Sequence, residues 1–341
     1  MLGNTNSTPE VTYLEVGETE DARLSFERDL ESIRIELRAY CYRMLGSAFD
    51  AEDAVQEALV RAWRHIDHFE GRASLRAWLY RIATNVCLDS IAARQRRALP
   101  ADLNAPGRPH DPLGDTLAAH EWVEPIADRW VVPAGGDPAE RAVVRDSVRL
   151  AFVAALQVLP ARQRAALILR DVLAWRPHEI ADLLGTTVVS VNSSLQRARQ
   201  TLAASDNGQR SVSDSNGEAS ERLLERYVHA FEEYDVESLV ALLHEDATWM
   251  MPPFPLWFRG AADIGAWFAA KPVDCRAIRL VPLELNGSSG FALYRPSPSG
   301  SYFEAFGVQV LDVRDGAIMA IDTFIDPRLV MLFGGSEVLT S

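Results

Sequence analysis

The sequence predicts a multidomain protein in which two all-α domains, a helical bundle and a helix-turn-helix, precede an α+β domain. Three observations lead to this prediction. Apolar residues recur with helical spacing across residues 22–97 and 137–203. Residues 98–136 and 204–218 are polar and rich in turn-forming residues, which is typical of linkers. Residues 219–334 begin with helical patterns and end in strand-like stretches.

Composition excludes several classes of protein. Residues 1–21 are polar and acidic, and no run of 18 apolar residues exists, so we expect a disordered N-terminus, no signal peptide, no membrane contact and a cytoplasmic protein. Cys41, Cys87 and Cys275 lie far apart, which argues against a disulfide framework or a zinc site. His65 and His68 have no further ligand in sight. We therefore predict neither a metal nor a cofactor.

The net charge of −14 argues at first sight against a nucleic-acid-binding protein. Counting by segment removes the objection. Residues 22–97 hold 13 Arg against 11 acidic residues, a balance of +2, and residues 160–202 hold six Arg against three, a balance of +3. The surplus acid lies in the N-terminal residues, the linker and the C-terminal third.

Within the first domain, Asp50 to Arg64 reads as an amphipathic helix. Asp50 is a suitable N-cap, and acidic residues in the first turn interact favourably with the helix dipole. Val55, Leu59 and Ala62 form the inward stripe. From composition alone, the outward residues are most simply a solvated acidic face.

The following helix has two distinct faces. Its buried stripe is predicted to be Leu75, Leu79, Ile82 and Val86. A neighbouring face carries an aromatic, a guanidinium and a carboxamide, which can stack on an unpaired base, hold phosphate and hydrogen-bond a base edge. That face consists of Trp78, Arg81, Asn85 and Asp89, and the helix runs out into an Arg-rich end.

Both segments resemble region 2 of extracytoplasmic-function sigma factors of the sigma-70 type. The resemblance implies that the first helix docks on the coiled coil of the largest subunit of core RNA polymerase and that the second melts promoter DNA. The residues implied for polymerase binding are Asp50, Glu52, Asp53, Gln56, Glu57 and Arg61. Those implied for the downstream promoter element are Phe69, Arg72, Trp78, Tyr80, Arg81, Asn85, Arg94, Arg96 and Arg97.

Residues 98–136 form an acidic, Pro-rich linker that we expect to contain no regular element. An inert connection is the simplest interpretation. The resemblance implies instead that the linker threads through the polymerase, where its acidic residues mimic nucleic acid.

The second domain, residues 137–203, has the form of a helix-turn-helix. Ala181 is small where two helices cross, Gly185 lies in the turn, and Val191 follows in the second helix. The predicted buried side of that helix is Val188, Val191, Leu195, Ala198 and Leu202. The domain resembles sigma region 4, which recognises the upstream promoter element, and polar side chains opposite the buried side suit major-groove and phosphate contacts. The implied DNA contacts are Thr187, Ser190, Asn192, Ser193, Gln196, Arg197 and Arg199.

Residues 219–334 resemble a SnoaL-like domain, a cone-shaped barrel of curved antiparallel sheet closed by helices around an apolar pocket. We expect the pocket to be lined by Trp249, Met251, Trp257, Tyr294, Phe306 and Asp322. Related folds include polyketide cyclases, steroid isomerases and epoxide hydrolases, with Asp322, His229 or His244 as candidate bases. Because no acid–base pair stands at a fixed spacing, we predict no catalysis; a small apolar ligand, an intramolecular contact and a filled core stay open.

The sequence therefore predicts an RNA polymerase sigma factor that binds core polymerase and promoter DNA and whose C-terminal domain modulates it in cis. The alternative is a helix-turn-helix regulator with a small-molecule domain. The segment from Phe324 to Phe333, including Asp326, Arg328 and Leu329, resembles a regulatory motif of fused-domain sigma factors. We expect it to hold the sigma domains in a compact state, with residues 335–341 as a tail.

Overall fold

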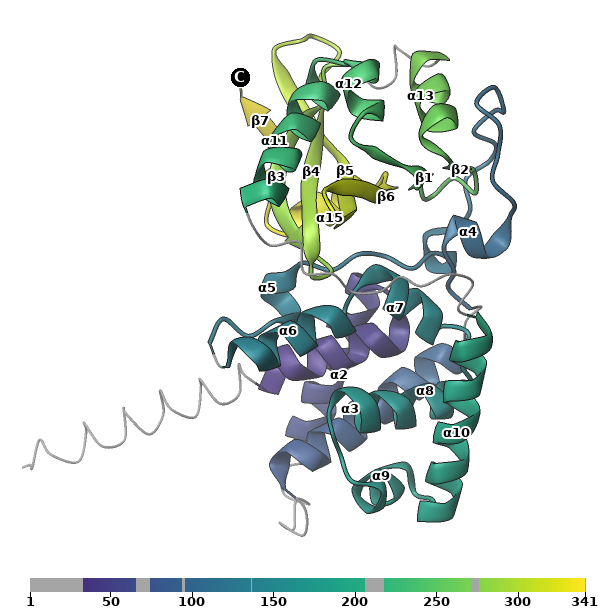
Figure 1. The fold of residues 1–341 in the computed structure, drawn as a ribbon. Coiled ribbons are helices and arrows are strands. Elements are labelled where there is room, and N and C mark those ends of the chain that lie inside the picture. The colour runs from purple at the N-terminus through teal and green to yellow at the C-terminus, as the bar shows by residue number, and fades with distance from the viewer. Residues whose placement is uncertain are drawn as a thin grey trace, which may run out of the picture.

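A computed structural model describes residues 33–65, 74–93, 96–135, 137–205, 218–270 and 276–340. Two helical domains form one half of the molecule and the α+β domain forms the other, with the linker running between them (Figure 1). The predicted disordered N-terminus 1–21 and residues 206–217 of the predicted flexible linker lie outside the described residues.

The first helical domain packs residues 33–45, α2 (Ala48–Arg64) and α3 (Leu75–Ala92) together. Helix α2 begins two residues before the predicted start, and its N-cap is Ser47, whose hydroxyl accepts a hydrogen bond from the Asp50 amide at 3.2 Å. The assignment of Asp50 as the N-cap was therefore wrong. Asp50 lies in the first turn instead, where a carboxylate still interacts favourably with the helix dipole.

The linker is more ordered than its composition predicts. It contains short helical turns, so the prediction that it has no regular element is wrong. Residues 122–128 are buried because they pass between the two halves of the molecule. The turns are α4 (Pro100–Leu103), η2 (Ala119–Glu121) and α5 (Asp128–Val131).

The second helical domain contains the predicted helix-turn-helix. Gly185 ends the first of its two helices in the left-handed conformation, with φ of 61°, which suits the residue type that lacks a Cβ atom. Val191 is buried as predicted, whereas Val188 is 41% exposed because it stands at the helix start, beyond the packing surface. The helices are α6 (Pro138–Ser147), α7 (Leu150–Leu156), α8 (Ala161–Leu167), the π-helical η3 (Ile168–Val172), α9 (Pro177–Leu184) and α10 (Val188–Ser205).

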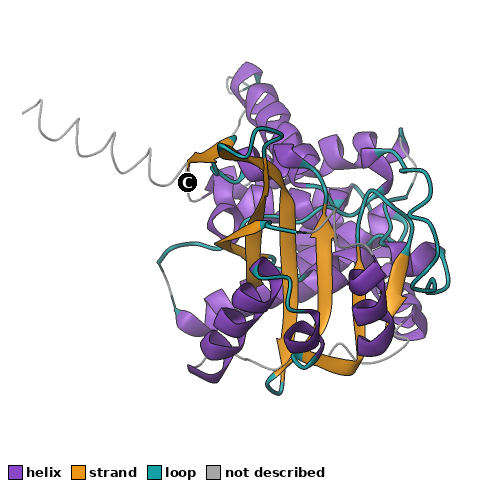
Figure 2. Ribbon diagram, turned by 90° about the horizontal axis from the view of Figure 1, so that it is seen from above, coloured by secondary structure: helices purple, strands orange, loops and turns teal. Residues whose placement is uncertain are grey.

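The C-terminal domain is built on one seven-stranded mixed sheet. Its order is β2-β1-β6-β5-β4-β3, with β7 paired to β5; β1 and β6 are parallel and the other pairs antiparallel. Helices lie on both sides of the strands in Figure 2. The strands are β1 (Leu243–Met250), β2 (Trp257–Arg259), β3 (Arg279–Leu285), β4 (Ser288–Pro296), β5 (Tyr302–Arg314), β6 (Ala317–Phe324) and β7 (Val338–Thr340). The helices are α11 (Glu218–Glu232), α12 (Val236–Val240), α13 (Ala261–Ala270) and α15 (Pro327–Leu332).

Two clusters of buried apolar side chains hold the protein together. One fills the concave side of the sheet beneath α11, α12 and α13. The other begins at Leu37 in the first domain, continues through the linker and the second domain, and ends at Phe333 against the convex side of the sheet. Since this second cluster crosses every domain boundary, burial of apolar surface stabilises the packed arrangement as well as each domain.

Candidate nucleic-acid interface and interdomain junction

The residues predicted to bind polymerase divide into an exposed and an internal group. Asp53, Gln56 and Glu57 are exposed on α2, where Glu57 pairs with the half-exposed Arg61 at 2.7 Å. Asp50 and Glu52 are engaged within the protein. Asp50 accepts a hydrogen bond from Arg97 at 2.6 Å, and Glu52 accepts bonds from Arg34 and Arg38, each at 2.6 Å. The part of this predicted surface that remains accessible to polymerase is therefore formed by Asp53, Gln56, Glu57 and Arg61.

The predicted melting helix α3 is only partly open to solvent. Asn85 is exposed, and Arg81 is exposed while its Nη2 donates to the carbonyl oxygen of Asp182 in α9 at 3.1 Å. Trp78 is half-buried. Helix α9 therefore lies against the face predicted to receive DNA.

Two predicted DNA contacts are core residues here. Tyr80 is fully buried, its ring centroid 5.3 Å from those of Tyr40 and Trp175, so its assignment to DNA was wrong for this arrangement. Arg97 is 6% exposed and donates to the carbonyl oxygens of Ala119 and Trp122, at 2.9 and 2.5 Å, besides its bond to Asp50. Arg96 remains exposed, whereas Phe69, Arg72 and Arg94 lie outside the described residues.

Helix α10 presents a polar surface opposite its buried side. Asn192, Gln196 and Arg197 are exposed, and Ser193 is half-buried. Thr187 begins the helix, its hydroxyl accepting from the Ser190 amide at 3.2 Å. Arg199 donates to both carboxylate oxygens of Asp171, at 3.1 and 2.6 Å, an exposed ion pair that competes with any phosphate contact.

The residues predicted to line one apolar pocket lie on opposite faces of the sheet. Trp249, Met251 and Phe306 pack with the concave cluster, whereas Trp257 and Tyr294 belong to the cluster on the convex side. Asp322 pairs in register with Met250 and Val310, which are also on the convex side. Because successive side chains of a strand alternate between faces, the predicted pocket does not exist as one site.

The deep end of the concave side is filled. The Trp249 ring stacks on Phe268 at 4.0 Å, and its Nε1 donates to Thr323 at 3.1 Å. Thr323 also accepts from Gln309, which in turn accepts from the Tyr227 hydroxyl at 2.6 Å. Among the described residues no group of three or more His, Cys, Asp and Glu side chains could hold a metal ion.

Comparison with known proteins identifies the family of the chain. Family models match three stretches of the chain: "Sigma-70 region 2" residues 30–97, "Sigma-70, region 4" residues 149–202 and "SnoaL-like domain" residues 224–321. The "ECF RNA polymerase sigma factor SigG" of Mycobacterium tuberculosis is 44% identical over 325 residues, which is 92% of this chain and 85% of that protein. The chain belongs to the ECF RNA polymerase sigma factors. This confirms the predicted family.

Other relatives extend the comparison. The sigma factor SigW of Bacillus subtilis is 30% identical, covering 48% of this chain and 78% of its own length. The crystal structure of the sigma factor SigJ of M. tuberculosis superimposes with a TM-score of 0.56 over 89% of this chain and 97% of that one, at 23% identity, and so shows the shared fold. The curated relatives are sigma factors rather than enzymes. Within the described ranges, no helix of this sigma factor is long and apolar enough to cross a membrane.

The turn between β3 and β4 joins the SnoaL-like domain to both sigma regions. Asn286, fully buried with φ of 55°, donates from Nδ2 to the Tyr42 hydroxyl of region 2 at 2.6 Å. The same nitrogen donates to the carbonyl oxygen of Val148, before region 4, at 2.7 Å. Its Oδ1 accepts from the Ile126 amide of the linker at 3.0 Å. Region 2, the linker and the residue before region 4 are thus joined by three hydrogen bonds to the side-chain amide of Asn286.

The neighbouring residue Gly287 strengthens this junction. Its amide donates to Asp128 of the linker at 2.7 Å. Asp128 Oδ2 is also ion-paired with Nε of Arg145 in α6 at 3.5 Å. Nη2 of the same arginine pairs with Oε1 of Glu284 in β3 at 3.2 Å. A Cβ atom on Gly287 would stand 2.6 Å from the Arg145 carbonyl oxygen, so no larger residue fits. Sequence analysis missed this site, although Asn-Gly between two strands is a strong signal for a hairpin turn.

The predicted regulatory segment also meets the sigma half, at region 2 rather than region 4. Arg328 lies over the ring of Phe49 at the start of α2, 5.3 Å from its centroid, and pairs with Asp326, the N-cap of α15, at 2.6 Å. Leu329 is buried in the cluster that crosses the domains. The ring of Phe333 packs edge-on against the ring of Trp130 in the linker, with 5.9 Å between the ring centroids.

A buried carboxyl group lies beneath this contact. Glu124 of the linker accepts a hydrogen bond from Ser47, and burial raises its pKa to about 7. The charged groups around it are Arg97 and Asp50 of region 2 and Asp326 and Arg328 of α15, and His120 lines the same hollow. Burial likewise raises the pKa of Asp128 to about 6.

Proposed function

We propose that this sigma factor directs promoter-specific transcription initiation and that its SnoaL-like domain controls the activity in cis. Core polymerase would bind the exposed side of α2 at Asp53, Gln56 and Glu57. Asn85 on α3 would contact the melted downstream element, and α10 would read the upstream element. The observation that carries the control is the buried Asn286, which bonds region 2, the linker and the entry to region 4 together.

The packed arrangement is suited to an inactive state. Helix α9 of region 4 lies against the α3 face of region 2, with Arg81 bonded to Asp182 and Tyr80 in ring contact with Trp175. A helix-turn-helix held there cannot read a separate upstream element while α3 engages the downstream one, because α9 covers part of the α3 face. Separation of the regions is then required for promoter binding, and the Asn286 turn opposes it.

Two matched glycine variants test this control. Gly287 and Gly316 both occupy hairpin turns with positive φ, 68° and 77°, so an Ala side chain costs a similar local strain at either. Only at Gly287 does the new Cβ meet another domain; nothing lies within 4 Å of it at Gly316. We expect Gly287→Ala to raise run-off transcription by reconstituted polymerase, and Gly316→Ala to leave it unchanged. Equal transcription by the two variants would contradict the proposal.

A further inference from the structure

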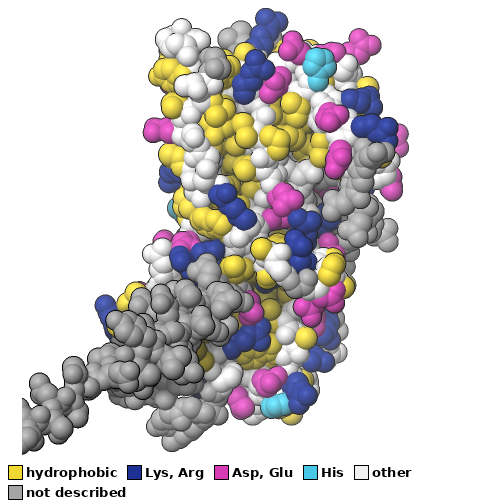
Figure 3. All heavy atoms as spheres, turned by 90° about the vertical axis from the view of Figure 1, so that its left-hand side faces the viewer, with side chains coloured by type: hydrophobic (Ala, Val, Ile, Leu, Met, Phe, Trp, Pro, Cys, Tyr) yellow, Lys and Arg dark blue, Asp and Glu magenta, His cyan; other side chains and the backbone are white. Residues whose placement is uncertain are grey.

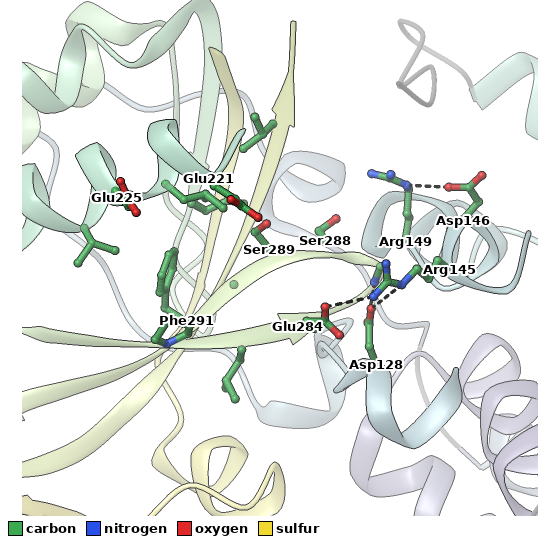
Figure 4. A pocket seen from close by; sticks show the side chains of 18 of the residues that line it. Asp128, Arg145, Asp146, Arg149, Glu221, Glu225, Glu284, Ser288, Ser289 and Phe291 are labelled. Atoms are coloured by element: carbon green, nitrogen blue, oxygen red, sulfur yellow. Dashed lines mark hydrogen bonds and ion pairs between the residues drawn. The ribbon is translucent and has the colours of Figure 1, made fainter. Parts of the chain in front are cut away.

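A hollow of about 1100 Å³ lies where the SnoaL-like domain meets α6 (Figure 4). It is the open end of the concave side whose deep end is filled by aromatic side chains. Helix α11 and strands β3 to β5 form one wall, and α6 with Asp128 forms the other. Its size is that of pockets for drug-sized molecules, which are commonly found between domains.

One side of the hollow is apolar. Leu224 and Val228 project from α11, and Phe291 and Leu311 from the sheet. Ser288 and Ser289 border this surface from β4, as Figure 4 shows. Figure 3, which faces the side that is on the left in Figure 1, shows hydrophobic side chains over the upper half and charges of both signs near the boundary with the lower half. Such a surface accommodates an extended apolar body.

The α6 side of the hollow supplies hydrogen-bond donors. Arg141 and Arg145 stand one turn apart and line it together. Among the described residues, the buried Nε atom of Arg141 has no hydrogen-bond partner. Arg145 is already ion-paired, since its Nε lies 3.5 Å from Asp128 Oδ2 and its Nη2 lies 3.2 Å from Glu284. Arg149, one turn further, is hydrogen-bonded to Asp146 at 3.2 Å. Buried donors without acceptors are unfavourable, and a carboxylate is the acceptor that matches guanidinium geometry best.

We propose that this hollow binds an amphipathic carboxylic acid, with its carboxylate on Arg141 and its apolar body against Phe291 and α11. The bound acid touches both the SnoaL-like domain and α6, so it stabilises their packed arrangement and lowers transcription. This last step rests on the proposed control in cis, whereas the binding site does not. Acidic residues line the hollow as well, which makes a cationic amphiphile the competing occupant; they are Asp128, Asp146, Glu221, Glu225, Glu232 and Glu284.

Three compounds that share one alkyl chain and differ in the head group distinguish these occupants: decanoate, decanol and decylamine. Each is titrated into the full-length protein by calorimetry, below its critical micelle concentration. We expect decanoate to bind most tightly, at one per chain. Arg141→Gln should weaken decanoate about tenfold or more, the effect of losing one charge-assisted hydrogen bond, and leave decanol unchanged. Arg226→Gln, an exposed position on α11 outside the hollow, is the control. Ser289→Leu fills the hollow and should weaken all tail-dependent binding.

Tighter binding of decylamine would overturn the proposal, as would decanoate binding that neither Arg141→Gln nor Ser289→Leu alters. Circular dichroism establishes that each variant is folded before its titration is interpreted. Calorimetry measures the site without transcription, so the two proposals can fail separately. Decanoate that binds at Arg141 yet leaves transcription by reconstituted polymerase unchanged would contradict control in cis and leave the site supported.

Discussion

Glu124 is a single carboxyl group whose environment links folding to pH. Its pKa is raised by burial from 4.5 to about 7, so the folded protein binds a proton that the unfolded chain releases at lower pH. The resulting stability is fully present below pH 4.5 and is lost as the pH rises through 7. The protonated group suits the packed arrangement because Glu124 of the linker lies between region 2 and α15, beside the carboxylates of Asp50 and Asp326.

We therefore expect the packed arrangement to weaken between about pH 4.5 and 7, by on the order of 3 kcal/mol. Glu124→Gln retains the acceptor for Ser47 and removes the titration, so this part of the pH dependence should disappear. Urea unfolding of both proteins across that pH range measures it. Parallel pH profiles for the variant and the original chain would show that Glu124 is not the group responsible.

A second residue-scale prediction concerns Asn85, which is exposed on the α3 face. An exposed carboxamide can hydrogen-bond an unpaired base, as in proteins that bind extruded bases. Asn85→Ala should reduce open-complex formation and relax sequence preference at the downstream element, while binding to core polymerase stays the same. Permanganate footprinting of promoter variants measures both effects, and an unchanged preference would remove Asn85 from the recognition surface.

At the scale of elements, helices with a strong apolar period could be predicted from the sequence and the linker could not. The α10 stripe of Val191, Leu195 and Ala198 is buried because its spacing follows the helix pitch. The linker has the composition of a loop, and local preference says nothing about partners far away in the chain. Its buried Trp122, Val123 and Ile126 are ordered by tertiary contacts alone.

The same reasoning explains the errors in the candidate sites. Tyr80 and Arg97 belong to residue types that suit nucleic acid, and only the packing of α8–α9 and of the linker shows that they are internal here. The prediction of a C-terminal pocket was wrong because residue type alone does not indicate which face of the sheet a side chain occupies. The pairing registers of β4 with β5, of β5 with β6 and of β6 with β1 separate Tyr294 and Asp322 from Trp249.

Helix α10 also carries a prediction about reading the upstream element. Arg197 is exposed and makes no ion pair with any residue that the structure describes, whereas Arg199 is held by Asp171. Arg197→Ala should cost about 1–3 kcal/mol of discrimination at one base pair, and Arg199→Ala should weaken binding evenly across sequences. Competition binding with a set of single-base promoter variants measures the difference. A uniform loss for Arg197→Ala would identify it as a phosphate contact.

For the whole molecule, the apolar cluster from Leu37 to Phe333 makes the SnoaL-like domain part of the sigma fold rather than an appendage. Deleting residues 206–341 removes both the Asn286 turn and the cover over the linker. We expect the truncated chain to bind core polymerase, since the exposed side of α2 is unaffected, and to differ markedly from the full chain in run-off transcription. Equal transcription by the two proteins would argue that the domain has no regulatory part.

The Asn286 turn has a consequence for gene dosage. A separate inhibitor would have to be made in step with the protein that it restrains, and excess of either partner would shift the fraction bound. Here Asn286 and Tyr42 belong to one polypeptide, so their contact is intramolecular and independent of concentration. Cells that express twice as much of this sigma factor would hold the same fraction of it in the packed arrangement. Its output would scale with expression and could not be released by titrating a partner away.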